Sequence, residues 1–398
     1  MNKSIFLLTH GDTGAFETSS VPFEVRIPLD GHGKKSVKKK AEVYPGLLVA
    51  DHKNAKIGEM HSGITGVVTE VADTHITIKA QELSAPAEGE DPKPTGVDPV
   101  AVASLAGDEL QTALKGLGID LRPLIRRCDL LIINALNPEP GITYAESMLT
   151  HSKSTINAGL EILKRLSPAS RTVIALATGS SAAFDGTDIA FINPVYPNSL
   201  DEMLTATITG KESMNGVNVI DLHTLYNLGA VVESGMPLTH TVVCVEGKNM
   251  IAPIGAPLGA LIKDAGIELS DGDSVIVGGP MRGIAIGDLN KGISKTTNAL
   301  FVMPAGSTAP ISDHACFSCG ACVQHCPSRI MPNMIARYVE FDDLDSCRQE
   351  NIAACMECGL CAYYCPARRP MLQFIRLGKH KIALEEAQVT ACALQVEE

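Results

Sequence analysis

The N-terminal part of the chain has short stretches in which apolar and polar positions alternate. The segments GVVTEV and HITIKA flank Ala72-Asp73, and isoleucines alternate with polar residues in the second segment. A period of two with a turn between predicts a half-buried β-hairpin. The region from about 22 to 82 is otherwise short strands and turn residues, so we predict a small all-β sandwich or barrel.

Apolar runs become longer between about residues 110 and 235. CDLLIINAL and RTVIALA are typical of strands buried on both faces. Between them, HSKSTINAGLEILKRL places Ile156, Leu160 and Leu163 on one helix face, with serines available as N-caps. SLDEMLTATI is predicted as a further helix with Ser199 as its possible cap. Strand, helix and strand in this order indicate a parallel, Rossmann-like sheet.

The pattern is rich in strands again from about 238 to 304. THTVVCVEG and NMIAPIG predict a hairpin, and SDGDSVIVGGP predicts a turn and a strand. PLGALIKDAG lies between them as a short helix with Leu258, Leu261 and Ile262 on its apolar face. We therefore predict a β-grasp-like unit here.

Two cysteine runs of identical spacing follow this unit. Each has the pattern C-x₂-C-x₂-C-x₃-C-P, and their cysteines are Cys316, Cys319, Cys322 and Cys326, then Cys355, Cys358, Cys361 and Cys365. Three closely spaced thiolates suit three corners of a cube of iron and sulfide. In two-cluster ferredoxins the fourth cysteine of each run ligates the other cluster. We therefore expect one [4Fe–4S] cluster on Cys316, Cys319, Cys322 and Cys365, and a second on Cys355, Cys358, Cys361 and Cys326.

Zinc and structural thiols are the alternatives for these cysteines. Zinc sites typically use two separated pairs of ligands, which this pattern does not provide. Gly320 and Gly359 lie between the second and third ligands of the two runs, where we expect the backbone to approach sulfide closely. The segment between the runs is predicted to be helical. The scattered cysteines are expected to be small buried residues or inert thiols; they are Cys128, Cys244, Cys347 and Cys392.

Composition narrows the classes of function. The chain has 398 residues, 4% aromatic residues, no Trp and a net charge of −12, which argues against a nucleic-acid partner. A basic cluster at Lys34, Lys35, Lys38, Lys39 and Lys40 is either a solvated loop or a docking patch for anionic lipid or an acidic partner. No apolar run is long enough for a membrane span, and we identify no signal peptide. We expect a cytoplasmic protein that reaches a membrane only through partner subunits.

Three loops are weaker candidates for binding sites. INALNPEPGIT follows a predicted parallel strand, where ligands commonly bind, and Glu139 in it is either a functional carboxylate or a solvated acid. KGLGID is too short to cradle a phosphate. VGGPMRG is an anion nest or, as we prefer, a turn between strands.

Over almost its whole length, the chain resembles the C subunit of the Rnf electron-transport complex. HSGITGVV is similar to the barrel-sandwich hairpin of that family, and LIINALNPEPGIT to its segment LIIN-G-A-E-x-E-P-x-I-T. VGGPMRG followed by KTTNAL matches the soluble-ligand-binding β-grasp (SLBB) region, and CMECGLCAYYCP followed by PMLQFIR matches the second cluster and its exit helix. The order of these motifs is more specific than the cysteines alone.

The chain departs from this family in its flavin loop. Flavin-binding relatives carry G-x-G-G-x-x-F-P-T before the IIN strand, whereas here Gly116-Leu117-Gly118 continues as IDLRP. The first loop acid of the family is Asn137, although Glu139 remains. Without those glycines the backbone cannot approach a flavin closely, so FMN and NADH binding are doubtful here.

The resemblance implies a multi-domain α/β plus β protein. The expected divisions are a barrel-sandwich domain (1–83), a linker (84–109), a Rossmann-like domain (110–235), a β-grasp SLBB domain (236–310), a helical dicluster [4Fe–4S] ferredoxin domain (311–380) and a tail (381–398). It implies an electron-transfer subunit without a catalytic site of its own, in an Rnf-like complex on the cytoplasmic face of a membrane. Its partners would be other subunits, a ferredoxin or a flavoprotein. The main alternative is an NADH-oxidising FMN enzyme. A lipoyl or biotin carrier is a weaker alternative, because EMHSGITG has no lysine at its hairpin tip.

Overall fold

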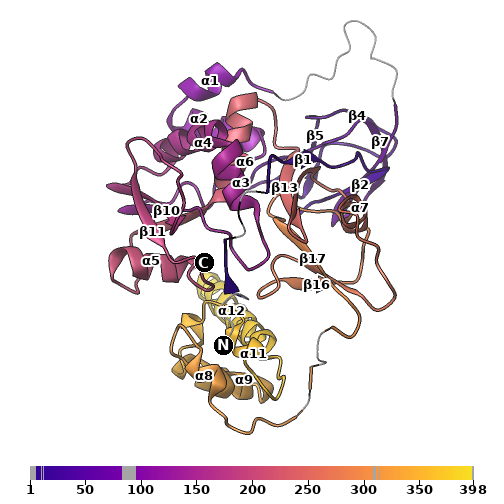
Figure 1. Cartoon of the computed structure of the whole chain (residues 1–398). Helices are drawn as coiled ribbons and strands as arrows, with labels where there is room; N and C mark the ends of the chain where they lie inside the picture. Colours follow the sequence, from indigo (N-terminus) through magenta and orange to yellow (C-terminus); the bar gives the residue numbers. More distant parts are fainter. Residues whose placement is uncertain are drawn as a thin grey trace, which may run out of the picture. The chain divides into compact units, whose positions relative to one another are not determined.

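The computed structural model describes residues 6–9, 11, 13–82, 96–307, 311–312 and 314–396. The chain forms two compact units (Figure 1). The first comprises Met1–Pro280 and Ile284–Val302, and the second comprises Met281–Gly283 and Met303–Glu398. Within the described ranges, no helix has both the length and the apolar character needed to cross a membrane.

The N-terminal strands of the first unit form two small sheets. The strands are β2 (Glu24–Pro28), β3 (Lys34–Lys35), β4 (Glu42–Val43), β5 (Leu48–Asp51), β6 (Met60–His61), β7 (Gly66–Val71) and β8 (His75–Ala80). One sheet has the order β2-β8-β7-β4 and the other β3-β5-β6. The predicted hairpin is confirmed as β7 and β8, which pair antiparallel. Thr77, expected on a polar face, is buried like Ile76 and Ile78, so both faces of β8 are covered there.

A parallel sheet follows, as predicted. Its elements are α1 (Pro99–Ser104), α2 (Gly107–Gly116), β9 (Leu130–Asn134), α3 (Tyr144–His151), α4 (Lys153–Leu166), β10 (Arg171–Ala177), β11 (Asp188–Ile192), α5 (Asp201–Thr209), β12 (Val217–Asp221) and α6 (Leu222–Ser234). The strand order is β11-β10-β9-β12, and every pairing in it is parallel. All five residues of β9 are buried, as its continuous apolar run predicts.

Helices α4 and α6 pack closely because glycines face each other. A Cβ on Gly159 would lie 2.4 Å from the carbonyl oxygen of Leu225, and one on Gly229 would lie 1.8 Å from that of Thr155. The predicted apolar face of α4 is confirmed, since Ile156, Leu160 and Leu163 are all buried. Only glycine at these crossings allows the two backbones to approach so closely.

A serine does lie at the N-cap of α4, although the side chain of this residue, Ser152, makes no cap hydrogen bond. The serine cap predicted for α5 is wrong. Ser199 lies one residue before the N-cap of α5, which is Leu200. Its hydroxyl donates instead to the carbonyl oxygen of Pro138 (2.7 Å), and its own carbonyl accepts from the side chain of Asn134 (2.8 Å). Bonds to the loop after β9 therefore replace the local cap.

The remaining strands of the first unit form a six-stranded sheet of order β1-β14-β13-β17-β15-β16. Its elements are β1 (Glu17–Thr18), β13 (His240–Val245), β14 (Lys248–Pro253), α7 (Leu258–Asp264), β15 (Ser274–Val277), β16 (Ile284–Ile286) and β17 (Ala299–Met303). The hairpin of β13 and β14 and the short helix α7 are confirmed. VGGPMRG connects the antiparallel strands β15 and β16, so the predicted turn is confirmed as well.

The hydrophobic core does not follow the predicted divisions. One continuous cluster joins side chains of the N-terminal strands, such as Val25 and Ile78, to those of the parallel sheet, such as Leu131 and Leu225. A second cluster lies within the six-stranded sheet and α7. The first unit is thus stabilised by packing across regions that the sequence predicts as separate domains.

The second unit is mostly helical. It contains α8 (Ala321–Gln324), α9 (Pro332–Glu340), α10 (Leu344–Gln349), the 3₁₀-helix η2 (Ile352–Ala354), α11 (Leu360–Tyr363) and α12 (Met371–Val396). The helical segment predicted between the cysteine runs is present but interrupted after Glu340. Its core contains Ile335, Val339 and Ile375 beside several cysteines.

Two predicted irregular segments contain helix. Part of the expected linker, residues 84–95, lies outside the described residues, but α1 and the start of α2 fall within its bounds. The expected tail from residue 381 belongs to α12, which continues to Val396. Strong helix formers such as Ala, Leu, Glu and Gln are frequent in this segment, and they favour continuation of the helix.

Candidate iron–sulfur site

The two cysteine runs have the same backbone conformation. Gly320 and Gly359 are the N-caps of the one-turn helices α8 and α11, with φ of 76° and 77°. Ser318 and Glu357 occupy equivalent positions with φ of 55° and 53°. The backbone N–H of each donates to the sulfur of the first cysteine of its run, at 3.4 Å in both cases. The repeat in the sequence is therefore a repeat in structure.

The glycines in the two runs share one conformational requirement, and the second also has a steric one. Both adopt the left-handed conformation that favours glycine. A Cβ on Gly359 would also lie 2.4 Å from the carbonyl oxygen of Met281, whereas one on Gly320 would meet no protein atom within 4 Å. Backbone conformation is thus the common requirement, and crowding is an additional one only in the second run.

The eight cysteines line two small cavities in a crossed arrangement. Cys365, from the second run, lines the first cavity with the first three cysteines of the first run: Cys316, Cys319 and Cys322. Cys326, from the first run, lines the second cavity with Cys355, Cys358 and Cys361. Among the described residues, no three His, Cys, Asp or Glu side chains lie close enough to share one metal ion. The thiols of each group are instead spread around a cavity, as ligands of separate irons are.

The two cavities differ in exposure. Cys316 and Cys319 are exposed to solvent, and Phe317 between them is 63% exposed. In the second cavity, Cys358 and Cys361 are buried. The first cysteine loop is therefore accessible at the surface of its unit, and the second is shielded.

Burial makes four of the cavity thiols weaker acids than a free cysteine. Burial raises the pKa of Cys358 to about 11, and it also raises the pKa of Cys322, Cys355 and Cys361. Such thiols are protonated when free at neutral pH. Iron binds the thiolate, so loading releases protons and compensates the cost of burying the charge.

A charged cluster lies beside the second cavity. Glu357, which lines that cavity, accepts from Arg376 Nε at 2.9 Å and from Lys379 Nζ at 3.0 Å. Lys379 Nζ also donates to the carbonyl oxygen of Cys355 at 2.5 Å. Burial opposes ionisation of Glu357, but the two basic side chains outweigh it and lower the pKa of its carboxyl below the usual value. We call these three residues the Glu357 clamp.

The first cavity has a different ionic neighbour. Arg369 lines it and pairs with Glu340, and the guanidinium lies 5.7 Å from the ring centre of Phe374. Sequence reasoning missed these charged residues and the clamp. The only available signal was the i, i+3 spacing of Arg376 and Lys379 after the second run, which indicates a common helix face but not its partner.

Those scattered cysteines whose side chains the structure describes line neither cavity. Cys244 and Cys347 are buried, as predicted, and Cys128 is half-buried. The Cys347 thiol lies 3.8 Å from the carbonyl oxygen of Ile335. The side chain of Cys392 lies outside the described residues.

Comparisons with known proteins agree with this geometry. Residues 309–366 match the family model of a 4Fe-4S dicluster domain. The chain is 31% identical over 322 residues to the C subunit of the ion-translocating oxidoreductase complex of Erwinia tasmaniensis, a match that covers 75% of this chain and 39% of that protein. The protein of the same name from Klebsiella pneumoniae is 31% identical over 306 residues, which are 71% of this chain and 40% of that protein.

The chain is homologous to the C subunits of ion-translocating oxidoreductase complexes. It carries the iron–sulfur dicluster domain that the cysteine runs predict. The match spans about two fifths of the length of these relatives.

Solved structures give a weaker comparison. An NAD+-reducing [NiFe]-hydrogenase in its air-oxidised state matches with a TM-score of 0.36 and 19% identity, over 66% of this chain and 54% of that chain. The H2-reduced state matches with a TM-score of 0.40 and 18% identity, over 73% and 65%. These values are too low to carry an argument about function.

In this protein, the loop that follows β9 is buried rather than solvated. Glu139 is 6% exposed, so the interpretation of Glu139 as a solvated loop acid is wrong. A Cβ on Gly279 of VGGPMRG would lie 2.2 Å from the carboxylate of Glu139. Asn137 is also buried; its amide donates to Leu8 O (2.7 Å) and Glu146 Oε2 (2.6 Å), and it accepts from Ala145 N. These contacts connect the loop to the body of the unit.

Two buried rings meet where the helices after β9 and β12 begin. Tyr144, at the start of the helix after β9, is buried, and its ring centre lies 5.8 Å from that of His223, at the start of the helix after β12. The His223 ring is hydrogen-bonded to Val242 O and to Thr241 Oγ1, both at 2.9 Å. The two helix starts are thus held together by a ring contact and by hydrogen bonds to β13.

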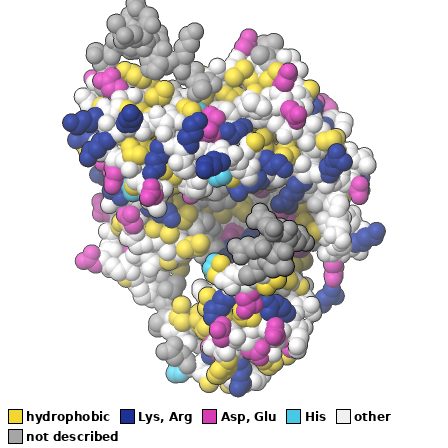
Figure 2. Space-filling model, turned by 180° about the vertical axis from the view of Figure 1, so that it is seen from behind, with side chains coloured by type: hydrophobic (Ala, Val, Ile, Leu, Met, Phe, Trp, Pro, Cys, Tyr) yellow, Lys and Arg dark blue, Asp and Glu magenta, His cyan; other side chains and the backbone are white. Residues whose placement is uncertain are grey.

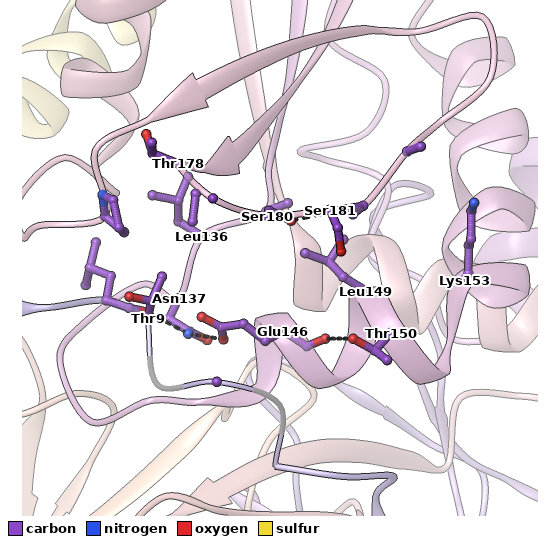
Figure 3. A pocket seen from close by; sticks show the side chains of 18 residues that line it. Thr9, Leu136, Asn137, Glu146, Leu149, Thr150, Lys153, Thr178, Ser180 and Ser181 are labelled. Atoms are coloured by element: carbon purple, nitrogen blue, oxygen red, sulfur yellow. Dashed lines mark hydrogen bonds between the residues drawn. The ribbon is translucent and has the colours of Figure 1, made fainter.

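A cavity of about 550 Å³ lies at the carboxyl ends of the neighbouring strands β9 and β10 (Figure 3). Its polar lining includes the hydroxyls of Thr9, Thr150, Thr178, Ser180 and Ser181. Figure 3 shows Asn137 and Glu146 pointing toward each other, while Lys153 lies apart from them. The Glu146 carboxylate is thus held by a structural hydrogen bond.

Proposed function

We propose that this protein is an electron-transfer iron–sulfur subunit of an Rnf-like, membrane-associated complex. One [4Fe–4S] cluster would be held by Cys316, Cys319, Cys322 and Cys365, and the other by Cys355, Cys358, Cys361 and Cys326. The crossed lining of the two cavities carries this proposal. Each cluster, when bound, supplies a one-electron redox centre.

The side chains of the second unit hold these ligands in place and control access to them. Backbone N–H groups of Ser318 and Glu357 donate to ligand sulfurs, which stabilises thiolate over thiol. Burial of Cys358 and Cys361 excludes water from the second site, whereas the first loop is open to a docked partner. Neither cavity supplies a group for hydride transfer, so we assign no catalytic residue.

Replacement of Cys326 by Ser tests the assignment. We expect damage to the cluster built on Cys355, Cys358 and Cys361, and an intact cluster on the first run. The measurement is EPR of the anaerobically purified, reduced variant, with iron and sulfide content. Cys347→Ser is the matched control, because Cys347 is a buried thiol of the same unit that lines neither cavity. Loss of the first-run cluster in the Cys326 variant would refute the crossing.

The finer domain names are part of the proposal. The two N-terminal sheets suit a barrel-sandwich domain (1–83), and the parallel sheet suits a Rossmann-like domain (110–235). The strand–helix arrangement around α7 suits a β-grasp SLBB domain (236–310), and residues 311–380 would form the ferredoxin module. The first three would form a docking scaffold derived from a flavoprotein.

Partner subunits would supply and remove the electrons and attach the protein to the cytoplasmic face of the membrane. The basic cluster near the N-terminus is one candidate contact surface for a partner. Its exposed members are Lys34, Lys38, Lys39 and Lys40, while Lys35 pairs with Asp73 at 2.6 Å. Figure 2 shows many basic side chains on one face, with acidic ones between them. Such a mixed surface suits an acidic partner protein better than a uniformly anionic lipid surface.

The alternative, an FMN-containing NADH dehydrogenase, has less support. The glycine loop typical of flavin-binding relatives is missing from the sequence. Flavin absorbance of the purified protein distinguishes the two functions.

A further inference from the structure

The two cysteine loops carry chemically different residues at the position two after their first cysteine. Ser318 in the first loop and Glu357 in the second share the same backbone conformation and the same N–H···S hydrogen bond. Ser318 is exposed, whereas Glu357 is connected to α12 by Arg376 and Lys379. The second loop therefore has an ionic connection to α12 at a position where the first loop has an exposed serine.

The clamp also brings positive charge to the second site. Lys379 Nζ donates to the carbonyl oxygen of Cys355, a residue that lines the second cavity, while its side chain is 28% exposed. Arg376 is 31% exposed and donates to the carbonyl oxygen of Arg282 at 2.8 Å, which fixes its direction. With Glu357 ionised, the three side chains carry a net charge of +1. Partial burial reduces the screening of that charge by water.

We propose that the Glu357 clamp sets the reduction potential of the second cluster, with Lys379 raising it and Glu357 lowering it. One-electron reduction takes the [4Fe–4S]²⁺ core to [4Fe–4S]¹⁺ and adds one negative charge to a site with four thiolates. A nearby ammonium stabilises the reduced form, and a nearby carboxylate destabilises it. Charge near a cluster is one of the determinants of its potential. The inference rests on the ligand assignment proposed above.

Two substitutions separate this electrostatic role from a structural one. Lys379→Met removes a positive charge, and Glu357→Gln removes a negative one, yet both break the clamp. We expect the reduction potential of the second cluster to shift in opposite directions in the two variants. At the wild-type midpoint potential, the ratio of reduced to oxidised second cluster should fall about tenfold in Lys379→Met, which is about 59 mV for one electron. The same ratio should rise in Glu357→Gln. A purely structural role would move both variants in the same direction.

The measurement is an EPR redox titration of the full chain, with chemical reductant and mediators, under anaerobic conditions. Variants Cys319→Ser and Cys358→Ser assign the signals to the first and second clusters. Lys381→Met is the matched control, because Lys381 lies on the same helix but pairs with exposed Asp342 at 2.7 Å. Lys379→Arg keeps the charge and should retain the wild-type potential.

The outcomes distinguish the two proposals. If both clusters are intact and the potential of the second shifts in the same direction in both variants, the role of the clamp is refuted. The same holds if the first cluster, or the control Lys381→Met, shows an equal shift in potential. Either result leaves the proposed function standing. A wild-type protein without a second cluster would refute the ligand assignment, and this inference with it. Iron and sulfide content shows whether each variant is loaded.

Discussion

Lys295 offers a sharp test of how the first unit is held together. Its Nζ donates to the carbonyl oxygens of Glu59 (2.5 Å) and Gly118 (2.7 Å), and a third carbonyl, that of Gly58, lies at 3.4 Å. The lysine thus joins the N-terminal strands to the segment after α2. We predict that Lys295→Met destabilises the protein, because two backbone carbonyls lose their donor at about 1–3 kcal/mol each. Removal of a buried charge offsets part of that loss.

The pH dependence of this effect has a defined sign. Burial lowers the pKa of Lys295 to about 7, although Asp120 and Glu59 oppose the shift. The unfolded chain has the usual lysine value near 10.5, so between these values it binds more protons than the folded chain. Wild-type stability therefore rises with pH across that window, by up to about 1.4 kcal/mol per unit. Below pH 7 both states are charged, and the cost of burying the charge is fully present.

The comparison of wild type with Lys295→Met isolates this contribution. The difference in the free energy of unfolding should grow by about 3 kcal/mol or less between about pH 7 and about pH 9, because only the wild type gains stability from loss of the proton. The chain has no Trp, so urea unfolding is followed by far-UV circular dichroism, with cluster absorbance as a separate reading of the second unit. A difference that stays constant or shrinks as pH rises would refute the lowered pKa of Lys295.

Three further predictions concern helix packing, flavin content and membrane association. Gly229→Ala should lower the free energy of unfolding by about 1–3 kcal/mol, because its Cβ would lie 1.8 Å from the carbonyl oxygen of Thr155. The control Gly33→Ala should be nearly neutral, because no atom lies within 4 Å of its Cβ position. Urea unfolding measures both variants. The purified protein should contain no stoichiometric FMN, and bleaching of a flavin band by NADH would contradict the proposed function. The protein should co-fractionate with membranes only when partner subunits are present. High salt should wash part of it off, because salt screens attraction between charges beyond about 8 Å. Tight, salt-independent binding to protein-free liposomes would contradict this prediction.

Local patterns in the sequence determined the secondary elements and the chemistry. Alternation predicted the β7–β8 hairpin, and continuous apolar runs predicted the parallel strands β9 and β10. The spacing of the cysteines indicated iron–sulfur ligation, because the geometry of a cluster requires several thiolates within one tight loop. These features depend on residues close together in the chain, where periodicity and spacing are informative.

The tertiary structure decided which distant residues meet. Cys365 lies with the first cysteine run and Cys326 with the second, a pairing that sequence analysis could propose only by analogy with ferredoxins. Ser199 bonds to the loop after β9 instead of capping its own helix. Glu357 meets two basic residues of α12 that neither its own run nor their spacing identifies as partners. Hydrogen bonds and ion pairs of this kind depend on how helices and loops pack, and nothing in local periodicity records that packing.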